Sequence, residues 1–82
     1  MEQLVYSPQS LGSAIKRQRK AKKLTQEEAG QAYNLDQTTI SSIEQGAPGT
    51  RLETLFRVLA SLDLEILIRP KNITVHKIKE NW

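Results

Sequence analysis

The stretch from residue 26 to residue 45, QEEAGQAYNLDQTTISSIEQ, constrains the fold more than any other part of the chain. Thr25 followed by Glu28 is a capping-box pattern, which predicts that a helix begins at Gln26. Asp36 is placed to cap a second helix a few residues later. The stretch therefore predicts two short helices joined by a tight turn.

The residues between these helices have the properties that such a turn requires. Gly30 leaves room for the second helix to cross the first closely, at a helix-propensity cost of roughly 1 kcal/mol. Asn34 stands where the turn needs a positive φ, which Asn tolerates better than most residues. Leu35 is expected to be the buried residue of the turn, with Ile40 and Ile43 pointing inward from the second helix. This pattern is a helix-turn-helix.

The outward face of the second helix is polar but uncharged. A helix that is merely solvated more often carries Lys and Glu, so this face is a candidate recognition surface. Its residues are Gln37, Thr38, Ser41, Ser42 and Gln45.

The net charge of +3 is distributed unevenly. Residues 1–24 carry a net +5 and residues 25–82 a net −2. The basic run IKRQRKAKK, which includes Lys22 and Lys23, has two interpretations. It is either a solvated helical face or a set of phosphate contacts, and the candidate recognition helix that follows within 15 residues favours the second.

Two further helices are expected. Residues 5–23 predict the first helix, with Ser7 as its cap and Pro8 at the first helical position. After the break at residues 46–49, Thr50 and Glu53 form a second capping-box pattern. It predicts a core helix with an apolar stripe of Leu52, Leu55, Phe56, Leu59 and Leu62.

From Leu62 to Arg69 the apolar period changes from 3.6 to 2, which predicts one β-strand with Leu64, Ile66 and Ile68 on one face. A single strand cannot satisfy its own backbone groups. The simplest arrangement pairs it with the same strand of a second copy, so a homodimer is expected. The alternative is a hairpin with residues 73–78 of the same chain.

Several classes of site are not expected. The chain has no Cys, and its single His76 has no ligand partners at suitable spacing, so we expect no metal, no cofactor and no enzymatic activity. The chain shows no signal peptide and no run of 18 apolar residues, so we expect a cytoplasmic protein without membrane contact. The single Trp82 either folds back on its own domain or serves as an interface anchor.

The residues described above resemble those of a known protein family. The segment IKRQRKAKKLTQEEAGQAYNLDQTTISSIEQG resembles the lambda-repressor-like (Xre-type) helix-turn-helix family, and the likeness continues through PGTRLETLFRVLASLDL, covering roughly residues 11–64. The opening Tyr6-Ser7-Pro8, the strand at residues 64–68 and the terminal Trp82 are similar to HipB-type antitoxins. The resemblance implies a mainly α fold of four to five helices, with the short C-terminal strand paired across a homodimer.

The resemblance also implies roles for individual residues. Base-reading positions fall on Gln37, Thr38 and Ser41, and a Gln paired with N6 and N7 of adenine contributes about 1 to 3 kcal/mol of discrimination. Arg19 and Glu44 match a paired Arg and Glu, which implies an ion pair between the first and third helices. Asp36 departs from the family, where a basic residue can stand, and we assign it to capping or to a cytosine amino group. The expected phosphate contacts are Thr25, Gln26, Thr39 and Ser42, with Lys22 and Lys23 added from the basic run.

The resulting hypothesis is a repressor that binds a palindromic operator as a homodimer, represses its own operon, and is the antitoxin of a HipA-like kinase toxin. We expect it in the bacterial cytoplasm, on the nucleoid when bound to DNA. Residues 1–69 are predicted to be the DNA-binding and dimerisation domain, and residues 70–82 a flexible or partner-binding tail with Trp82 as a toxin anchor. The alternatives are a module that mainly binds the toxin, and a stand-alone or phage-type regulator without a toxin.

Overall fold

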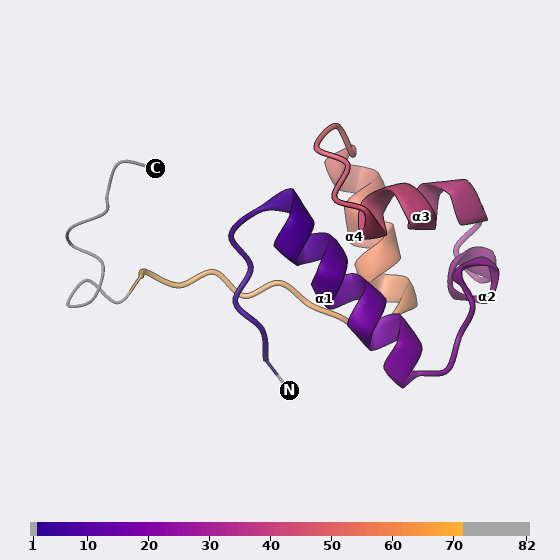
Figure 1. Cartoon of the computed structure of the whole chain (residues 1–82), viewed down its shortest axis with the longest axis horizontal. Helices are drawn as coiled ribbons and strands as arrows, with labels where there is room; N and C mark the ends of the chain where they lie inside the picture. The colour runs from indigo at the N-terminus through magenta and orange to yellow at the C-terminus, as the bar shows by residue number, and fades with distance from the viewer. Residues whose placement is uncertain (1, 72–82) are drawn as a thin grey trace.

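The computed structural model describes residues 2–71, which form four helices, so the mainly α fold is confirmed. Figure 1 shows α1 crossing in front of α4, with α2 and α3 together at the side of the molecule away from the chain termini. The helix bounds are α1 Pro8–Ala21, α2 Gln26–Gln31, α3 Gln37–Glu44 and α4 Leu52–Ser61.

One hydrophobic core joins the four helices. Four of its members are fully buried: Ile15 of α1, Ile40 of α3, Val58 of α4 and Leu62 at the end of α4. Leu11, Leu24, Leu55 and Leu64 pack against it from the edge. The core residues are Ile15, Ala29, Leu35, Ile40, Ile43, Val58, Leu59 and Leu62.

The first helix is shorter than predicted at both ends. Ser7 has an extended backbone, with φ −156° and ψ 164°, and its hydroxyl accepts from the Ser10 amide at 3.0 Å. The predicted cap at Ser7 and the proline at the first helical position are thus confirmed, but the start at residue 5 is wrong. At the other end Lys23 has a φ of 59°, which turns the chain out of the helix.

The predicted cap of α4 is also wrong. The residue at the cap is Arg51, which makes no side-chain cap hydrogen bond. The Thr50 hydroxyl instead donates to the Ala47 carbonyl at 3.1 Å, so it stabilises the preceding turn. A Thr hydroxyl in a capping pattern can bond to more than one neighbouring backbone group. Here the Thr50 hydroxyl bonds to the turn after α3 instead of capping α4.

The apolar stripe of α4 is only partly buried. Leu59 and Leu62 are buried as expected, but Leu52 is 69% exposed and Phe56 54% exposed. Val58, which the stripe omitted, is fully buried. The helix therefore turns a different part of its circumference to the core than the sequence pattern indicated.

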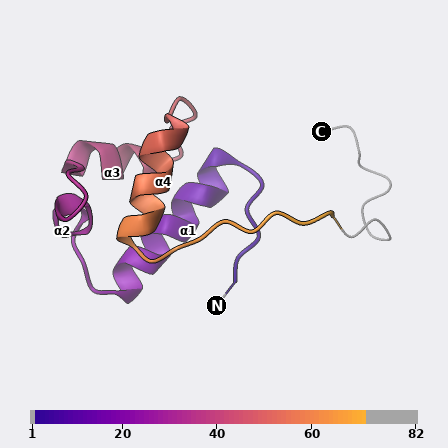
Figure 2. The same ribbon diagram turned by 180° about the vertical axis from the view of Figure 1, so that it is seen from behind.

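The chain after α4 is extended and contains no strand within the described residues. Figures 1 and 2 show it running from the end of α4 past α1 toward the N-terminal segment. Lys71 Nζ lies 5.3 Å from the centre of the Tyr6 ring, which places the end of this segment beside residue 6. Leu64 packs on the core, whereas Ile66 and Ile68 are exposed. Pairing of this segment with a second copy stays a prediction.

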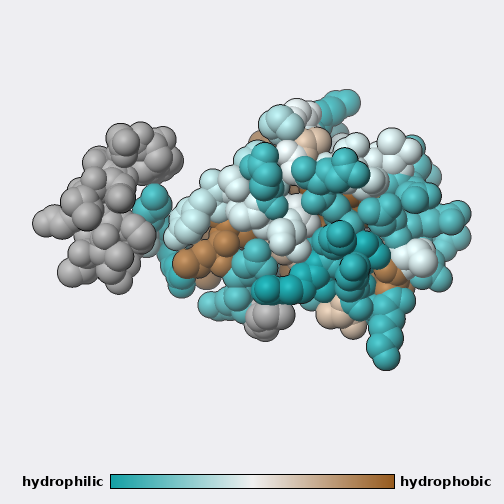
Figure 3. All heavy atoms as spheres, in the orientation of Figure 1, coloured by the Kyte–Doolittle hydropathy of each residue, from teal (hydrophilic) through white to brown (hydrophobic). Residues whose placement is uncertain are grey.

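Exposed apolar side chains also gather on the surface. Figure 3 shows hydrophobic atoms where the extended segment leaves the helices, whereas the helical face in the same view is largely hydrophilic. The predicted hairpin partner at residues 73–78, His76 and Trp82 lie outside the described residues, as does the tail from residue 72 onward.

Candidate nucleic-acid interface

The candidate interface is built on α3, which is anchored by two isoleucines. Ile40 is fully buried and Ile43 is 4% exposed, so the helix cannot rotate without losing core packing. Gln37 and Thr38 consequently point outward and are exposed, and Ser41 is half-buried. The structure thus brings the three predicted base-reading residues onto one helix.

Asp36 caps this helix, as predicted. Its Oδ1 accepts from the Thr39 amide at 2.9 Å. Hydrogen bonds from Thr39 hold the pKa of the Asp36 carboxyl below its ordinary value, so the group stays charged at the start of the helix, where a negative charge is favourable.

The turn between α2 and α3 has the predicted conformation. Asn34 has a φ of 58°. The Leu35 amide donates to the Gly30 carbonyl at 2.9 Å. A Cβ at Gly30 would collide with the Leu35 carbonyl oxygen, so no larger side chain fits at this position. The crossing of the two helices therefore depends on Gly30.

A contact that sequence reasoning missed also holds this turn. Arg57 of α4 donates from Nη2 to the Tyr33 carbonyl at 2.8 Å. This bond ties the turn between α2 and α3 to α4, one of the helices that form the core. Arg57 carried no signal in the sequence, since one arginine in an amphipathic helix is expected on the solvated side.

The predicted capping box at the start of α2 is confirmed. The Glu28 amide donates to Thr25 Oγ1 at 3.0 Å, and the Thr25 amide donates to Glu28 Oε1 at 2.8 Å. Thr25 remains exposed and Gln26 is half-buried. Both lie at the start of α2.

A chain of hydrogen bonds joins three helices beneath this surface. Arg19 Nε lies 2.6 Å from Glu44 Oε2, and Arg19 Nη2 donates to Glu44 Oε1 at 3.1 Å, which confirms the expected ion pair. Gln26 Nε2 donates to Glu44 Oε1 at 3.1 Å. Gln37 Nε2 donates to Gln26 Oε1 at 3.4 Å. The first candidate base-reading residue is thus connected to a covered ion pair.

The ion pair is almost closed to water. The side chains of Arg19 and Glu44 are 10% and 3% exposed. Burial raises the pKa of the Glu44 carboxyl, but hydrogen bonds from Arg19 and Gln26, helped by the charges of Arg19 and Lys16, outweigh it and hold that pKa below its ordinary value. Glu44 is therefore an ionised acceptor inside the domain.

The predicted phosphate-contact residues differ in their surroundings. Lys22 Nζ lies 2.8 Å from Asp63 Oδ2, so Lys22 forms an ion pair with a residue just after the end of α4. Lys23 is exposed and follows the end of α1. Thr39 is half-buried and Ser42 exposed on α3. A polar depression of about 520 Å³ lies beside the start of α3, lined by Glu27, Gln31, Asn34, Leu35, Asp36 and Gln37.

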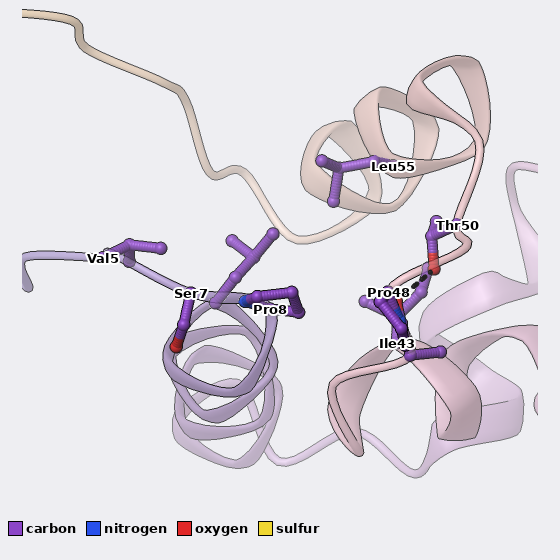
Figure 4. A pocket seen from close by; sticks show the side chains of 9 residues that line it. Val5, Ser7, Pro8, Ile43, Pro48, Thr50 and Leu55 are labelled. Atoms are coloured by element: carbon purple, nitrogen blue, oxygen red, sulfur yellow. Dashed lines mark hydrogen bonds between the residues drawn. The ribbon is translucent and has the colours of Figure 1, made fainter. Parts of the chain in front are cut away.

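A second concave surface lies at the opposite end of α3. It is an apolar pocket of about 280 Å³ between the start of α1, the α3–α4 loop and α4 (Figure 4). None of its lining residues is an acid, a base or a thiol, so we assign no chemistry to it. The lining is Val5, Ser7, Pro8, Leu11, Ile43, Ala47, Pro48, Thr50 and Leu55.

Two other packing residues were missed by sequence reasoning. A Cβ at Gly12 of α1 would lie 2.6 Å from the Glu44 carbonyl oxygen and would collide with that of Ile43, so α1 and α3 touch here backbone to backbone. Gln18 Nε2 of α1 donates to the Leu62 carbonyl at 2.9 Å, which ties the C-terminal end of α4 to α1. The sequence signal for Gly12 was its position inside a largely polar helix, where Gly lowers helix stability unless a neighbouring segment needs the space.

Within residues 2–71, no group of three or more His, Cys, Asp or Glu side chains is placed to hold a metal ion. None of the helices in that range is long and apolar enough to cross a membrane.

Comparisons with known proteins agree with this architecture. The sequence profile of a family described as helix-turn-helix matches residues 15–68. The antitoxin HipB of Escherichia coli strain K12 is 36% identical over 66 residues, which cover 80% of this chain and 75% of that protein. An uncharacterised HTH-type transcriptional regulator, y4dL of Sinorhizobium fredii, is 33% identical over 70 residues, which cover 85% of this chain and 36% of that protein.

Solved structures lead to the same group of proteins. A HipA-HipB-O2-O3 complex contains a chain that superposes with a TM-score of 0.81 at 34% identity, covering 87% of this chain and all of that one. A HipB-O4 20mer complex gives a TM-score of 0.79 at 35% identity, covering 84% of this chain and 97% of that one.

Proposed function

Because the chain belongs to the lambda-repressor-like (Xre-type) helix-turn-helix family and is similar to the HipB antitoxins, we propose that it is a DNA-binding repressor that acts as the antitoxin of a HipA-like kinase toxin and represses its own operon. The observation that carries the proposal is the outward face of α3, which is polar, uncharged and held rigidly by Ile40 and Ile43. The solved relatives, which are complexes of HipB with operator DNA and with HipA, support it. No enzymatic activity is part of the proposal.

In the proposed complex α3 enters the major groove. Gln37, Thr38 and Ser41 read base edges, because side chains on one face of a helix reach neighbouring base pairs in that groove. Contacts to phosphate position the helix and make binding sensitive to salt. We assign these contacts to Thr25, Gln26, Thr39, Ser42, Lys22 and Lys23.

The functional unit is proposed to be a homodimer built from residues 1–69. A palindromic operator would present two half-sites about 34 Å apart, one for each α3. The exposed apolar residues support this proposal, since a surface of this kind is typical of an interface. They are Leu52 and Phe56 on α4, Ile66, Leu67 and Ile68 on the extended segment, with Leu64, Ile66 and Ile68 as the proposed strand face.

We assign toxin binding in part to residues 70–82, with Trp82 as the anchor. We expect the protein in the bacterial cytoplasm, on the nucleoid when it is bound to DNA. Deleting Asn81 and Trp82 is expected to lower affinity for the toxin and leave DNA binding unchanged. Gln37→Ala is expected to lower affinity for DNA and leave toxin binding unchanged. A tail deletion without effect on toxin binding would remove the anchor role.

The experiment that tests the repressor assignment is a binding titration on the promoter of the chain's own operon. Gln37→Ala and Ser41→Ala should each bring binding to this promoter closer to binding to a scrambled duplex. Gln31→Ala and Ser13→Ala, which change the same residue types at exposed positions of α2 and α1, should keep the wild-type difference. If the α3 variants bind both duplexes as the wild type does, α3 is not the recognition helix.

The dimer is tested separately by sedimentation. Ile66→Asp together with Ile68→Asp should convert a dimer to a monomer at low micromolar concentration, and Glu65→Lys should not. A wild-type protein that sediments as a monomer at that concentration would contradict the proposed dimer.

The second candidate is a regulator of the same fold without a toxin. The similarity to y4dL, an HTH-type transcriptional regulator of which this chain covers 36%, favours it. A kinase-like reading frame next to this gene would decide for the antitoxin, and its absence would favour the stand-alone regulator.

A further inference from the structure

We propose that Arg57 sets the half-site spacing that the protein recognises, because it fixes the turn of the helix-turn-helix to the helix that carries the proposed dimer face. The proposal rests on the proposed function, since it needs two copies of α3 on one palindromic operator. Arg57 is in this sense a positioning residue, which acts on DNA recognition through the turn between α2 and α3.

The exposed and buried sides of α4 place Arg57 at their border. Leu52 is 69% exposed and Phe56, one turn later, is 54% exposed, and these two residues belong to the proposed dimer face. Val58 is fully buried, and the two residues from Phe56 to Val58 turn the helix by about 200°. Arg57 stands between them and is half-buried. Its side chain can therefore hold a neighbouring segment without entering the core or the dimer face.

The segment that Arg57 holds is the turn that follows α2. Arg57 Nη2 donates to the Tyr33 carbonyl at 2.8 Å and lies 3.5 Å from the Asn34 carbonyl oxygen. Carbonyls at the end of a helix have no partner within that helix, and basic side chains can bond to them. The last turn of α2 has no basic residue of its own. Arg57 thus supplies from α4 the cap that the sequence of α2 lacks.

This bond gives a direction to a contact that is otherwise apolar. Ala29, a small residue, is the member of the hydrophobic core that α2 supplies. Apolar packing is non-directional, whereas a hydrogen bond has a preferred distance and angle. The turn itself is defined by the φ of 58° at Asn34 and leads into α3 two residues later. The Arg57 bond therefore links the orientation of α4 to the start of α3.

Half-site spacing follows from this link. In a dimer, the position of each α3 relative to its own α4 decides how far apart the two copies of α3 lie, and a matching operator needs about 34 Å. One base pair more or less moves a half-site by about 3.4 Å and turns it by about 34° around the DNA axis. A firm link prevents α3 from following the displaced half-site, whereas a loose link allows it.

The test measures spacing preference rather than affinity. The half-sites in the chain's own promoter are located by footprinting. The full-length protein is then titrated against that duplex and against duplexes with one base pair inserted or deleted between the half-sites. The wild type should bind the native spacing at least about tenfold more tightly, because both half-sites of an altered operator can be contacted only if the DNA is deformed.

Arg57→Met is the main variant, because it keeps an unbranched side chain that packs on α4 and removes every donor. We expect its preference for the native spacing to fall to less than about threefold, while it still prefers the promoter to a scrambled duplex. Arg57→Lys keeps a cationic donor and should restore most of the spacing preference. Arg51→Met, the same change at an exposed position before α4, should leave that preference unaltered.

The outcomes separate the explanations. If Arg57→Met weakens binding equally at every spacing, Arg57 only stabilises the domain and the proposal is overturned. The proposal is also overturned if Arg57→Met sediments as a monomer where the wild type is a dimer, because Arg57 then acts on the dimer face. Circular dichroism confirms that each variant is folded, and should Arg57→Met fail to fold, Arg57→Gln, with a shorter neutral side chain, decides.

Failure of the proposed function gives a different result. A wild type that binds scrambled DNA as well as its own promoter contradicts the repressor assignment. A wild type that prefers its promoter but binds all three spacings equally contradicts the role of Arg57 alone.

Discussion

Arg19 Nε and Glu44 Oε2 lie 2.6 Å apart, at the contact between the last turn of α1 and the last residue of α3. Arg19 also donates from Nη1 to the Leu24 carbonyl at 2.8 Å, so its guanidinium is bonded on both sides. The pair fixes α3 on α1, whose relative position decides where the recognition surface lies.

Removing the acid of this pair should destabilise the domain strongly. Glu44→Ala leaves a covered guanidinium without its counter-charge, and we expect the free energy of unfolding to fall by about 3 kcal/mol. Urea denaturation followed by circular dichroism measures this value. Glu2→Ala removes an exposed carboxylate and should change stability by less than about 0.5 kcal/mol. Equal losses in the two variants would show that the ion pair contributes nothing specific.

Stability should also depend on pH through Glu44. The native pKa of this carboxyl lies below its ordinary value of 4.5, so its contribution is complete above that pH and is lost as the pH falls through the native pKa. The wild type should therefore lose stability in acid faster than Glu44→Gln does. Urea titrations between about pH 7 and about pH 3 compare the two slopes. Parallel slopes would assign the acid sensitivity to other carboxyl groups.

Two glycine variants should differ in their effect on stability. Gly12→Ala puts a methyl group 2.6 Å from the Glu44 carbonyl oxygen, and backbone cannot move aside as a flexible side chain can. We expect a loss of about 2 kcal/mol from overpacking, after the gain in helix propensity is included. Gly49→Ala meets nothing within 4 Å and should be neutral. The comparison is made by thermal unfolding, and a stable Gly12→Ala protein would mean that α1 and α3 are further apart than described.

The role of Asp36 can be separated into capping and repulsion. Asn also caps helices, so Asp36→Asn should keep the thermal midpoint, whereas Asp36→Ala should lower it. Because Asp36→Asn removes a negative charge beside the proposed DNA surface, it should bind the promoter severalfold more tightly at low salt and less so at high salt. Glu53→Gln, an exposed acid on α4, is the control. Weaker binding confined to one C·G position would instead assign Asp36 to a cytosine amino group.

Much of the candidate site could be predicted because its determinants are local. The cap at Asp36 bonds to an amide three residues away, and the positive φ of Asn34 belongs to a turn whose helices are adjacent in the chain. The inward direction of Ile40 and Ile43 follows from helical spacing alone. The family pattern added the pair of Arg19 and Glu44, which no local rule contains.

What failed was decided by segments distant in sequence. Leu52 and Phe56 look like core residues in an isolated helix, yet they are exposed, whereas Val58 of the same helix is buried in the core shared by the four helices. Gly12 is required only because residues 43 and 44 come against it, about thirty positions later.

The amino-acid sequence by itself determined the helix-turn-helix, its caps and its family, since these depend on bonds and packing within a few residues. Only the tertiary structure decided which face of α4 is covered, which glycine lies at a backbone contact, and that Gln26 lies between Glu44 and Gln37. The physical reason is that side-chain burial and hydrogen-bond direction depend on the atoms opposite, and those atoms come from helices whose placement a local pattern does not contain.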